Sequence, residues 1–201
     1  MFTGIIQEVG KVKSATSLNG GGKELEIACT FANSCHVDES ISVNGVCLTV
    51  TAFTEDTFTV QVVEETLRKT SIGDLKPASP VNLERSLTLN KGIEGHLVQG
   101  HVDTTGTITK IEKEETGWLI TIEYPDEFTD MIVGRGSITI EGISLTIARE
   151  KDNIFTVAII PYTWDHTNLS QKSEGDQVNL EFDVIGKYVV KYLSKIGRDS
   201  L

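Results

Sequence analysis

The sequence predicts an all-β protein made of two similar barrels followed by one C-terminal α-helix. Three observations lead to this prediction. The second half of the chain repeats the first at a fixed spacing, and both halves consist of short β-branched runs separated by turn signals. The last residues, 185–201, have no counterpart in the first half and follow a helical spacing of apolar residues instead.

The repeat is clearest around one seven-residue motif. Asn44-Gly45-Val46-Cys47-Leu48-Thr49-Val50 recurs as Glu141-Gly142-Ile143-Ser144-Leu145-Thr146-Ile147, an offset of 142 − 45 = 97. The same offset relates 58–60 to 155–157 and 81–84 to 178–181. A period of this length is too long for a solenoid unit and fits a small domain. We therefore predict a tandem duplication with domains at 1–88 and 89–184, and a separate helix at 185–201.

In the first half, the strands are predicted from runs rich in β-branched residues. Gly and Pro clusters give turns at 13–22 and 77–80, and helical turns are expected near 31–39 and 64–68. The strands themselves are expected at 1–12, 25–29, 40–50, 58–63 and 80–87.

The second half repeats this order, with a short helix near 125–131 and a turn at Pro161. Its strands are expected at 102–111, 118–123, 137–147, 154–160 and 178–183. Many short strands with little helix indicate a small closed barrel in each half, because closure removes the exposed strand edges.

The tail is predicted to be an amphipathic helix, because its apolar residues recur at helical spacing and its lysines take the other side. An apolar helix face must be covered. Two alternatives remain open, a bundle with other subunits or packing on the chain's own barrel. The apolar positions are Ile185, Val189, Tyr192, Leu193 and Ile196, and the lysines are Lys187, Lys191 and Lys195.

The composition excludes several classes of partner. A net charge of −11 disfavours binding to nucleic acid or to an anionic membrane. No apolar run approaches the roughly 18 to 20 residues that span a membrane, and the amino terminus has no signal-peptide pattern. Three cysteines, Cys29, Cys35 and Cys47, fall in no CxxC pair, which argues against a disulfide framework or a structural zinc site. We expect a cytoplasmic protein without a metal.

The repeated motif supplies the first candidate site residues. Cys47 and Thr49 are two apart on a predicted strand and point the same way, as do Ser144 and Thr146. Such a row of thiol and hydroxyl groups can line a pocket for a ligand rich in hydrogen-bonding atoms. The alternative is that Cys47 is a small buried hydrophobe, but a serine at the matching position would suit a dry core poorly.

Other candidates lie outside the motif. His96 and His101 flank the opening strand of the second copy, and a neutral histidine is a natural base, although a structural role is the alternative. Arg135 lies between two glycines, a flexible setting in which a cation could approach an anionic ligand, or it is a solvated surface residue. Thr66 and Thr163 are expected to cap turns.

Taken together, several motifs resemble the riboflavin synthase family of the trimeric α-chain type. The resemblance runs from residue 1 to about residue 195 with few gaps. It departs at Arg135, where many members have lysine, and at Tyr162. The motifs are Met1–Ile6, Ser40–Thr49, Glu65–Leu67, Gly95–Asp103, Glu141–Thr146 and Ile160–Thr163.

The resemblance implies two six-stranded Greek-key barrels and a C-terminal trimerising helix. It also implies a transferase that dismutates two molecules of 6,7-dimethyl-8-ribityllumazine. One molecule donates a four-carbon unit to the other, which yields riboflavin and 5-amino-6-(D-ribitylamino)uracil without a cofactor or metal. The expected assembly is a homotrimer in which the facing barrels come from different subunits. A complex with lumazine synthase is left open.

The resemblance also implies site residues. His101 would assist loss of a proton from the C7 methyl group, with Thr146 nearby, and Cys47 and Ser144 would position or activate a nucleophile. Ser40 joins these four as a catalytic candidate. The first substrate site would comprise Gly4, Ile5, Ile6, Cys47, Leu48, Thr49, Gln61, Val62, Val63, Glu64, Glu65 and Thr66. The second would comprise Gly100, His101, Val102, Arg135, Ser144, Leu145, Thr146, Ala158, Ile159, Ile160, Pro161, Tyr162 and Thr163.

Two rival functions are weighed against this one. A non-catalytic lumazine or flavin carrier would share the fold, but the carrier proteins resembling this family depart at the positions of Cys47 and His101, which this chain keeps. Fold alone would not decide between them. A barrel for single-stranded nucleic acid would need a basic, aromatic surface, which the acidic charge and 6% aromatic content oppose.

Overall fold

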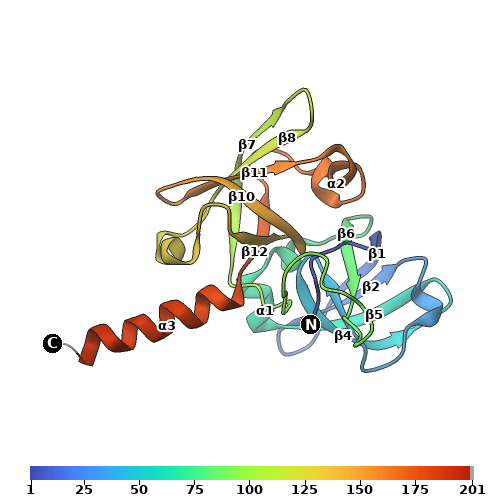
Figure 1. The fold of residues 1–201 in the computed structure, drawn as a ribbon. Coiled ribbons are helices and arrows are strands. Elements are labelled where there is room, and N and C mark those ends of the chain that lie inside the picture. The colour runs from blue at the N-terminus through green and yellow to red at the C-terminus, as the bar shows by residue number, and fades with distance from the viewer. Residues whose placement is uncertain (200–201) are drawn as a thin grey trace.

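The computed structural model describes residues 1–199, which form two closed antiparallel barrels of six strands each and a C-terminal helix (Figure 1). This confirms the predicted fold class. Residues 200–201 of the predicted helical segment lie outside the described residues. Each barrel has its own core of buried apolar side chains, and the equivalent residues Phe58 and Phe155 are both fully buried.

The first barrel has the strand order β1-β2-β5-β4-β3-β6. The connection from β2 to β3 carries the 3-10 turn η1 (Ala32–Ser34), and α1 (Glu64–Lys69) with η2 (Ser71–Asp74) leads into β6. The strands are β1 Glu8–Ser17, β2 Gly22–Ala28, β3 Ser40–Val43, β4 Val46–Phe53, β5 Thr57–Val63 and β6 Pro80–Arg85.

The second barrel repeats this topology, with β7–β12 in the places of β1–β6. It carries η3 (Asp126–Met131), α2 (Pro161–Asp165) and η4 (Asn168–Gln171) at the corresponding connections. The strands are β7 Thr104–Lys113, β8 Trp118–Glu123, β9 Ser137–Ile140, β10 Ile143–Lys151, β11 Ile154–Ile159 and β12 Gln177–Phe182.

The structure corrects the expectation of single strands at 40–50 and 137–147. Each segment is a hairpin, and its turn residues Asn44-Gly45 and Glu141-Gly142 all have positive φ. Two-residue turns of this kind match the twist of a β-hairpin. The two turns also meet, because a Cβ added to Gly45 would lie 2.7 Å from the Gly142 amide nitrogen.

Two smaller expectations are also corrected. The strand predicted at 1–12 begins only at Glu8, because residues 1–7 leave the barrel and run towards the other half of the chain, where Phe2 bridges Val98. Pro161 begins the short helix α2 rather than a turn, which suits a residue whose fixed φ favours the first helical position.

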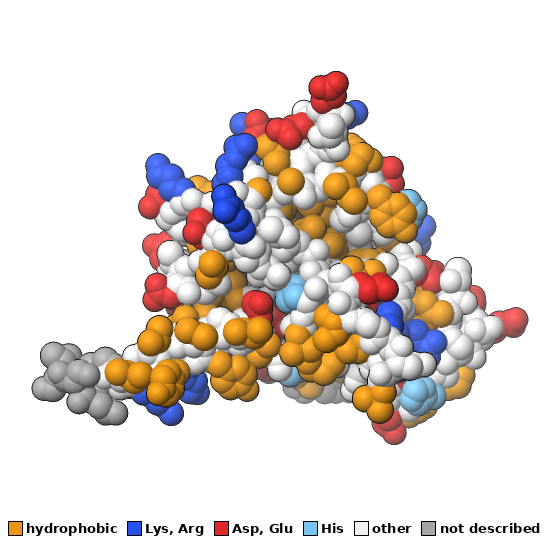
Figure 2. Space-filling view, in the orientation of Figure 1, with side chains coloured by type: hydrophobic (Ala, Val, Ile, Leu, Met, Phe, Trp, Pro, Cys, Tyr) orange, Lys and Arg blue, Asp and Glu red, His pale blue; other side chains and the backbone are white. Residues whose placement is uncertain are grey.

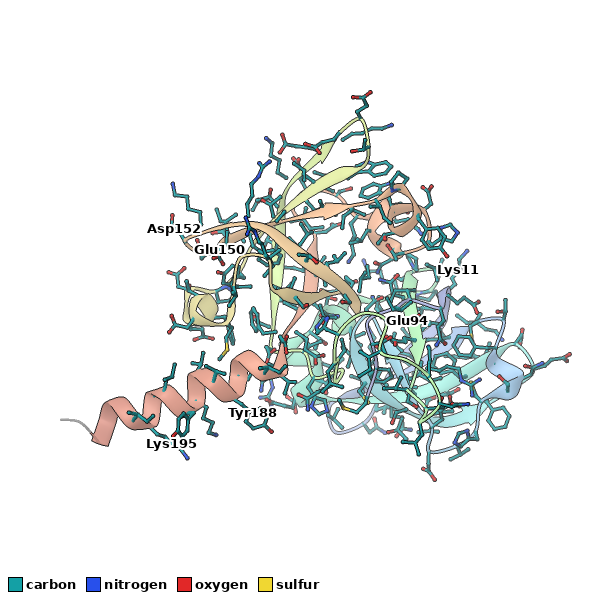
Figure 3. The ribbon with its side chains drawn as sticks, in the orientation of Figure 1. Lys11, Glu94, Glu150, Asp152, Tyr188 and Lys195 are labelled. Atoms are coloured by element: carbon teal, nitrogen blue, oxygen red, sulfur yellow. The ribbon has the colours of Figure 1, made fainter. Side chains whose placement is uncertain are left out.

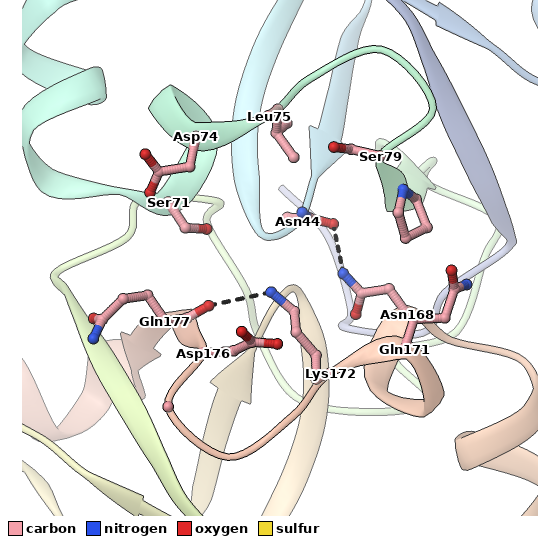
Figure 4. Close-up of a pocket in the computed structure, with 12 residues that line it drawn as sticks. Asn44, Ser71, Asp74, Leu75, Ser79, Asn168, Gln171, Lys172, Asp176 and Gln177 are labelled. Atoms are coloured by element: carbon pink, nitrogen blue, oxygen red, sulfur yellow. Dashed lines mark hydrogen bonds between the residues drawn. The ribbon is translucent and has the colours of Figure 1, made fainter.

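Polar side chains form the junction between the barrels, around the touching turns. Asn82 Nδ2 donates to the Glu141 carbonyl oxygen at 3.0 Å, and Asn179 Nδ2 donates to the Asn44 carbonyl oxygen at 2.9 Å. The buried Glu141 carboxylate lies 3.2 Å from Lys172 Nζ. A cavity of about 330 Å³ opens here between the barrels, beside the Asn44–Asn168 hydrogen bond (Figure 4).

Beyond its first turn, where Lys187 pairs with Asp103, the C-terminal helix α3 (Val184–Asp199) projects away from both barrels (Figure 1). Apolar side chains line its length (Figure 2), and Tyr188 and Lys195 mark its position in Figure 3. Ile185, Tyr188, Tyr192 and Leu193 are each more than half exposed. The alternative in which this face packs on the chain's own barrel is therefore wrong. Within residues 1–199, no helix is long and apolar enough to cross a membrane.

Candidate functional site

The candidate side chains of the repeated motif lie on the outside of the barrels. Along β4, residues 46, 48 and 50 are buried in the barrel core, whereas Cys47 is half-buried and Thr49 is exposed. Ser144 and Thr146 repeat this pattern on β10. The predicted pairing of Cys47 with Thr49 on one strand face is confirmed, but the face looks outward because apolar side chains fill the interior.

A cavity of about 150 Å³ lies beside Cys47 on the first barrel. Cys47 N donates a hydrogen bond of 2.8 Å to the Gly100 carbonyl oxygen, so a backbone segment from the second half closes one side. Six residues predicted for the substrate sites meet here, together with Val46, Lys69 and Thr70. They are Cys47, Glu65, Thr66, Gly100, His101 and Val102.

The second barrel has the equivalent backbone arrangement around Ser144, and the surroundings of Cys47 and of Ser144 are called the first and second pocket, with the described cavity lying at the first. Ser144 N donates a hydrogen bond of 2.8 Å to the Gly4 carbonyl oxygen. Gly4 and Gly100 both have positive φ, and a Cβ on either would lie 2.6 Å from the Cβ of Ser144 or Cys47 respectively. Only glycine fits such an approach, so both pockets require it in the crossing segment.

The structure therefore corrects the grouping of the predicted site residues. The segment containing Gly4, Ile5 and Ile6 had been assigned to the first site, but it reaches the second barrel, where Ile6 packs against the core. The segment 100–102 had been assigned to the second site, but Val102 packs against the first core. Each pocket is thus built from one barrel and the opening segment of the other half.

Two buried glutamates hold the crossing segments. Glu84 on β6 accepts hydrogen bonds from the backbone N–H groups of Thr3 and Gly4, at 2.7 and 2.9 Å. Glu181, at the equivalent position on β12, accepts from Gln99, Gly100 and His101 at 2.7–2.9 Å.

Both carboxyls are at least 98% buried. Burial raises the pKa of each, and the N–H donors act in the opposite direction. The identical glutamates in the two halves were the available sequence signal for this pair.

His96 belongs to the second pocket and was not placed in a site from the sequence. Its Nδ1 lies 2.7 Å from Ser144 Oγ and its Nε2 lies 3.2 Å from Thr139 Oγ1. Burial lowers the pKa of His96, which favours the neutral ring between two hydroxyls. Among the described residues, no histidine is hydrogen-bonded to the Cys47 thiol in the same way.

Three expectations about individual residues change. His101 lines the cavity beside Cys47 on the first barrel, whereas Thr146 lies exposed on β10 of the second barrel. Ser40 on β3 pairs with Thr49 on β4 and faces a different cavity, next to Arg85. Arg135 is not in a flexible setting, because it has a φ of +67° and donates its N–H to the Ile147 carbonyl oxygen at 2.9 Å.

The remaining predicted residues lie around these pockets. Val63 and Ile160, at equivalent strand ends, are 64% and 60% exposed, so each barrel presents an apolar side chain there. Gln61 Nε2 donates to Glu24. The capping role expected of Thr66 and Thr163 belongs instead to Thr70 and Thr167, whose hydroxyls accept from the next turns.

The second barrel differs from the first in one more respect. Trp118 and Trp164 stack with ring centroids 4.5 Å apart beside the end of β11. The first barrel has Lys23 and Leu67 at these positions, because Lys23 pairs with Val62 as Trp118 pairs with Ile159. Among residues 1–199, no group of three or more His, Cys, Asp or Glu side chains could hold a metal ion.

Comparison with known proteins places this geometry in context. The family model described as the lumazine binding domain matches twice, at residues 3–86 and 99–183. The chain is 44% identical to riboflavin synthase of Actinobacillus pleuropneumoniae and 43% identical to that of Bacillus subtilis strain 168. Each alignment covers 99% of this chain and 93% of the relative. The solved structure of LumP complexed with riboflavin has a TM-score of 0.84 at 24% identity, over 90% of this chain and 99% of that one, which supports the fold.

Proposed function

We propose that this chain, which belongs to the riboflavin synthase family, converts two molecules of 6,7-dimethyl-8-ribityllumazine into riboflavin and 5-amino-6-(D-ribitylamino)uracil. The observation that supports the proposal is the pair of equivalent outward-facing sites at Cys47 and Ser144, each closed on one side by the opening segment of the other half. Two copies of one substrate need two similar sites, and holding both copies in fixed geometry makes their encounter local.

The reaction needs no outside oxidant or reductant. The four-carbon unit that one lumazine loses is the unit that the other gains, so the atoms and electrons of two substrates account for both products. The protein must bind two molecules, orient them, and move protons. Its polar groups at the pockets are suited to those three tasks.

His101 is the proposed base that takes a proton from the C7 methyl group of one lumazine. It lies at the edge of the Cys47 cavity, and its backbone is held by Glu181. Cys47 and Ser144 are proposed to position or activate the nucleophile that adds at C7 in each pocket. Thr49 and Thr146, exposed on the same strand faces, are proposed to hydrogen-bond the ligand.

The pockets differ enough to give the two substrates opposite roles. Ser144 Oγ has His96 as a partner at 2.7 Å, whereas the Cys47 thiol has no hydrogen-bond partner among the described residues. The stacked tryptophans are present only in the second barrel. These differences would let one pocket favour the donor and the other the acceptor.

We further propose that the working form is a homotrimer. The Cys47 cavity of about 150 Å³ is small for this ligand, since sites that enclose a small molecule typically measure about 300 to 1,000 Å³. A pocket of one chain facing the other pocket of a neighbour would complete both. It would also bring His101 of one chain towards Thr146 of the next. The three free thiols are consistent with the reducing cytoplasm, which we propose as the compartment.

The proposal is tested by incubating the purified chain with 6,7-dimethyl-8-ribityllumazine without added metal or nucleotide. Chromatography should show one riboflavin and one pyrimidinedione formed for every two lumazines consumed. Tight binding of the lumazine with no riboflavin formed would select the carrier function instead.

The role of His101 has its own test. His101→Ala should lower turnover by about a hundredfold or more, while the Kd for the lumazine changes much less. Equal losses in turnover and binding would contradict the assignment of His101 as the base. His36→Ala, at an exposed histidine beside a different cavity, is the matched control and should turn over normally.

A further inference from the structure

The buried carboxylates Glu84 and Glu181 each lie in one barrel but hold a segment whose backbone is hydrogen-bonded to the motif strand of the other barrel, at Ser144 and at Cys47 respectively. We propose that they are crossed positioning residues, with Glu181 setting the backbone at Cys47 and Glu84 setting the backbone at Ser144. The inference rests on the proposed function for the statement that the two pockets bind substrate. The crossed contacts themselves come from the structure alone.

The contacts run in the same order in both halves. On the second barrel, Glu181 Oε2 accepts the N–H groups of Gly100 and His101 at 2.8 and 2.9 Å. The Gly100 carbonyl oxygen then accepts the N–H of Cys47 on the first barrel at 2.8 Å. One carboxylate therefore fixes both the wall of the Cys47 pocket and the backbone of His101.

The reciprocal chain starts from the first barrel. Glu84 Oε2 accepts the N–H of Gly4 at 2.9 Å, and Oε1 accepts both the N–H and the hydroxyl of Thr3. The Gly4 carbonyl oxygen accepts the N–H of Ser144 on the second barrel at 2.8 Å. Ile6 and Val102 continue the crossing by packing on the opposite cores.

A carboxylate is the side chain that this position requires. Both of its oxygens accept, and in each case both oxygens receive backbone N–H donors. A glutamine of the same shape offers only one acceptor oxygen, so its amide N–H₂ must face at least one backbone donor. A buried donor without a partner costs free energy, so the crossing segment would loosen although every pocket side chain stays in place.

The test compares Glu181→Gln with Glu84→Gln by site-resolved amide hydrogen exchange in the full-length chain without substrate. In Glu181→Gln, exchange at the Cys47 amide should rise by about tenfold and exchange at the Ser144 amide by less than about twofold. Glu84→Gln should show the reverse pattern. Each variant serves as the matched control of the other.

The crossed pattern separates positioning from a general loss of stability. A merely structural role would raise exchange at both amides alike in both variants, and that result would overturn the proposal, as would a larger effect within each glutamate's own barrel. If either variant does not fold, Glu181→Asp and Glu84→Asp keep the charge, shorten the reach by one methylene, and should show the same crossed pattern. Absence of turnover in the wild-type chain would contradict the proposed function but not the exchange result.

Discussion

Cys47 and Ser144 occupy equivalent positions on β4 and β10, but the residues around them make them chemically different. Ser144 Oγ contacts the half-buried His96, and Cys47 faces a cavity beside the exposed His101. A thiol that is only half-buried remains open to reagents, whereas a buried thiol is inert. The accessibility of Cys47 is therefore a direct probe of the first pocket.

Cys47 should be the first of the three thiols to react with iodoacetamide at mildly alkaline pH. Cys29 and Cys35 are at least 92% buried. Burial raises the pKa of Cys29 to about 12 and also raises that of Cys35, so both stay protonated. Intact mass and peptide mapping would identify the labelled residue, and Cys47→Ser should remove the fast phase. Earlier labelling of Cys29 or Cys35 would contradict the geometry described above.

His96 should make a pH-dependent contribution to stability. Because burial lowers its pKa in the folded state, the unfolded chain binds more protons below the ordinary value near 6.5, and stability is lost as the pH falls through the folded pKa. Glu84 and Glu181 have raised pKa values, so their contribution falls as the pH rises from about 4.5. Where their pH ranges overlap, His96 makes the protein less stable as the pH falls, whereas the two glutamates make it more stable.

The difference between wild type and His96→Gln isolates the histidine. Urea unfolding at several pH values between about 4 and 8 should show this difference shrinking as the pH falls below about 6.5. His36→Gln, at a largely exposed histidine, is the control and should show no such loss. A difference that grows towards acid pH would mean that His96 is protonated in the folded protein.

At the residue level, the sequence identifies candidate side chains by the chemistry of their functional groups. Cys47 and His101 were chosen for their thiol and imidazole groups, and the structure brings them to one cavity. The sequence could not show which barrel each segment reaches, because that depends on how residues 1–7 and 97–102 leave their own barrels. His96 was left out of the site because its partners, Ser144 and Thr139, are 48 and 43 residues away.

At the scale of elements, the two hairpin turns explain why the motif is repeated so closely. Asn44-Gly45 and Glu141-Gly142 lie back to back, and their side chains join the polar network between the barrels. Asn168 Nδ2 donates both to Asn44 and to Glu141, at 3.2 and 2.9 Å. The turns therefore set the relative position of the barrels, on which the crossed pockets depend.

Gly45→Ala and Gly142→Ala should each be strongly destabilising. A Cβ at either position would lie 2.7 Å from a backbone nitrogen of the other turn, and the positive φ adds strain. Strain and overlap together should cost about 2 to 5 kcal/mol of unfolding free energy. Urea unfolding at one fixed protein concentration would measure it.

The matched controls are Gly20→Ala and Gly175→Ala. Both glycines have positive φ, and no other heavy atom lies within 4 Å of the added Cβ. In these variants the loss of unfolding free energy should therefore come from the positive φ alone, and should be about 1 to 2 kcal/mol. Equal losses of unfolding free energy in Gly45→Ala and Gly20→Ala would mean that the contact between the two turns does not contribute to stability.

Most of the elements could be predicted, because alternating and β-branched runs identify strands locally. The segment 118–123 was predicted as β8 with its observed bounds. The hairpins at 40–50 and 137–147 were missed because the apolar residues on both sides of each turn resemble one continuous strand, although Asn44-Gly45 itself is a strong hairpin signal. In the second copy Glu141-Gly142 replaces the clearer Asn44-Gly45 signal. The start of β1 was misplaced because the pattern of residues 1–7 is also that of an extended segment that crosses to another barrel.

At the scale of the whole molecule, one chain exposes three features that a neighbouring copy could cover. The apolar face of α3 points into solvent, the Cys47 cavity is small, and Val63 and Ile160 are exposed at equivalent places. Lys187 Nζ lies 2.6 Å from Asp103 Oδ2, and Asp103 accepts the N–H of Phe182. The first turn of α3 is therefore tied to the segment that carries His101, so the direction of the helix and the first pocket are linked.

Leu193→Asp should convert the proposed trimer into monomers and remove turnover without removing ligand binding. Leu193 is 59% exposed on the apolar face of α3. In a bundle about a threefold axis, three introduced carboxylates would be desolvated close to one another, which is strongly unfavourable. Monomers would still carry both pockets, but two loaded pockets would meet only by collision. Turnover should therefore fall by more than about a hundredfold.

Ser194→Asp is the matched control, because it adds the same charge at the adjacent residue on the polar side of the helix. Sedimentation should show trimers for Ser194→Asp and monomers for Leu193→Asp, with both binding the lumazine in fluorescence titration. A Leu193→Asp protein that stays trimeric would show that α3 does not hold the assembly. A monomer with normal turnover would show that one chain brings its own two pockets together, although His101 lies at the first barrel and Thr146 on the second.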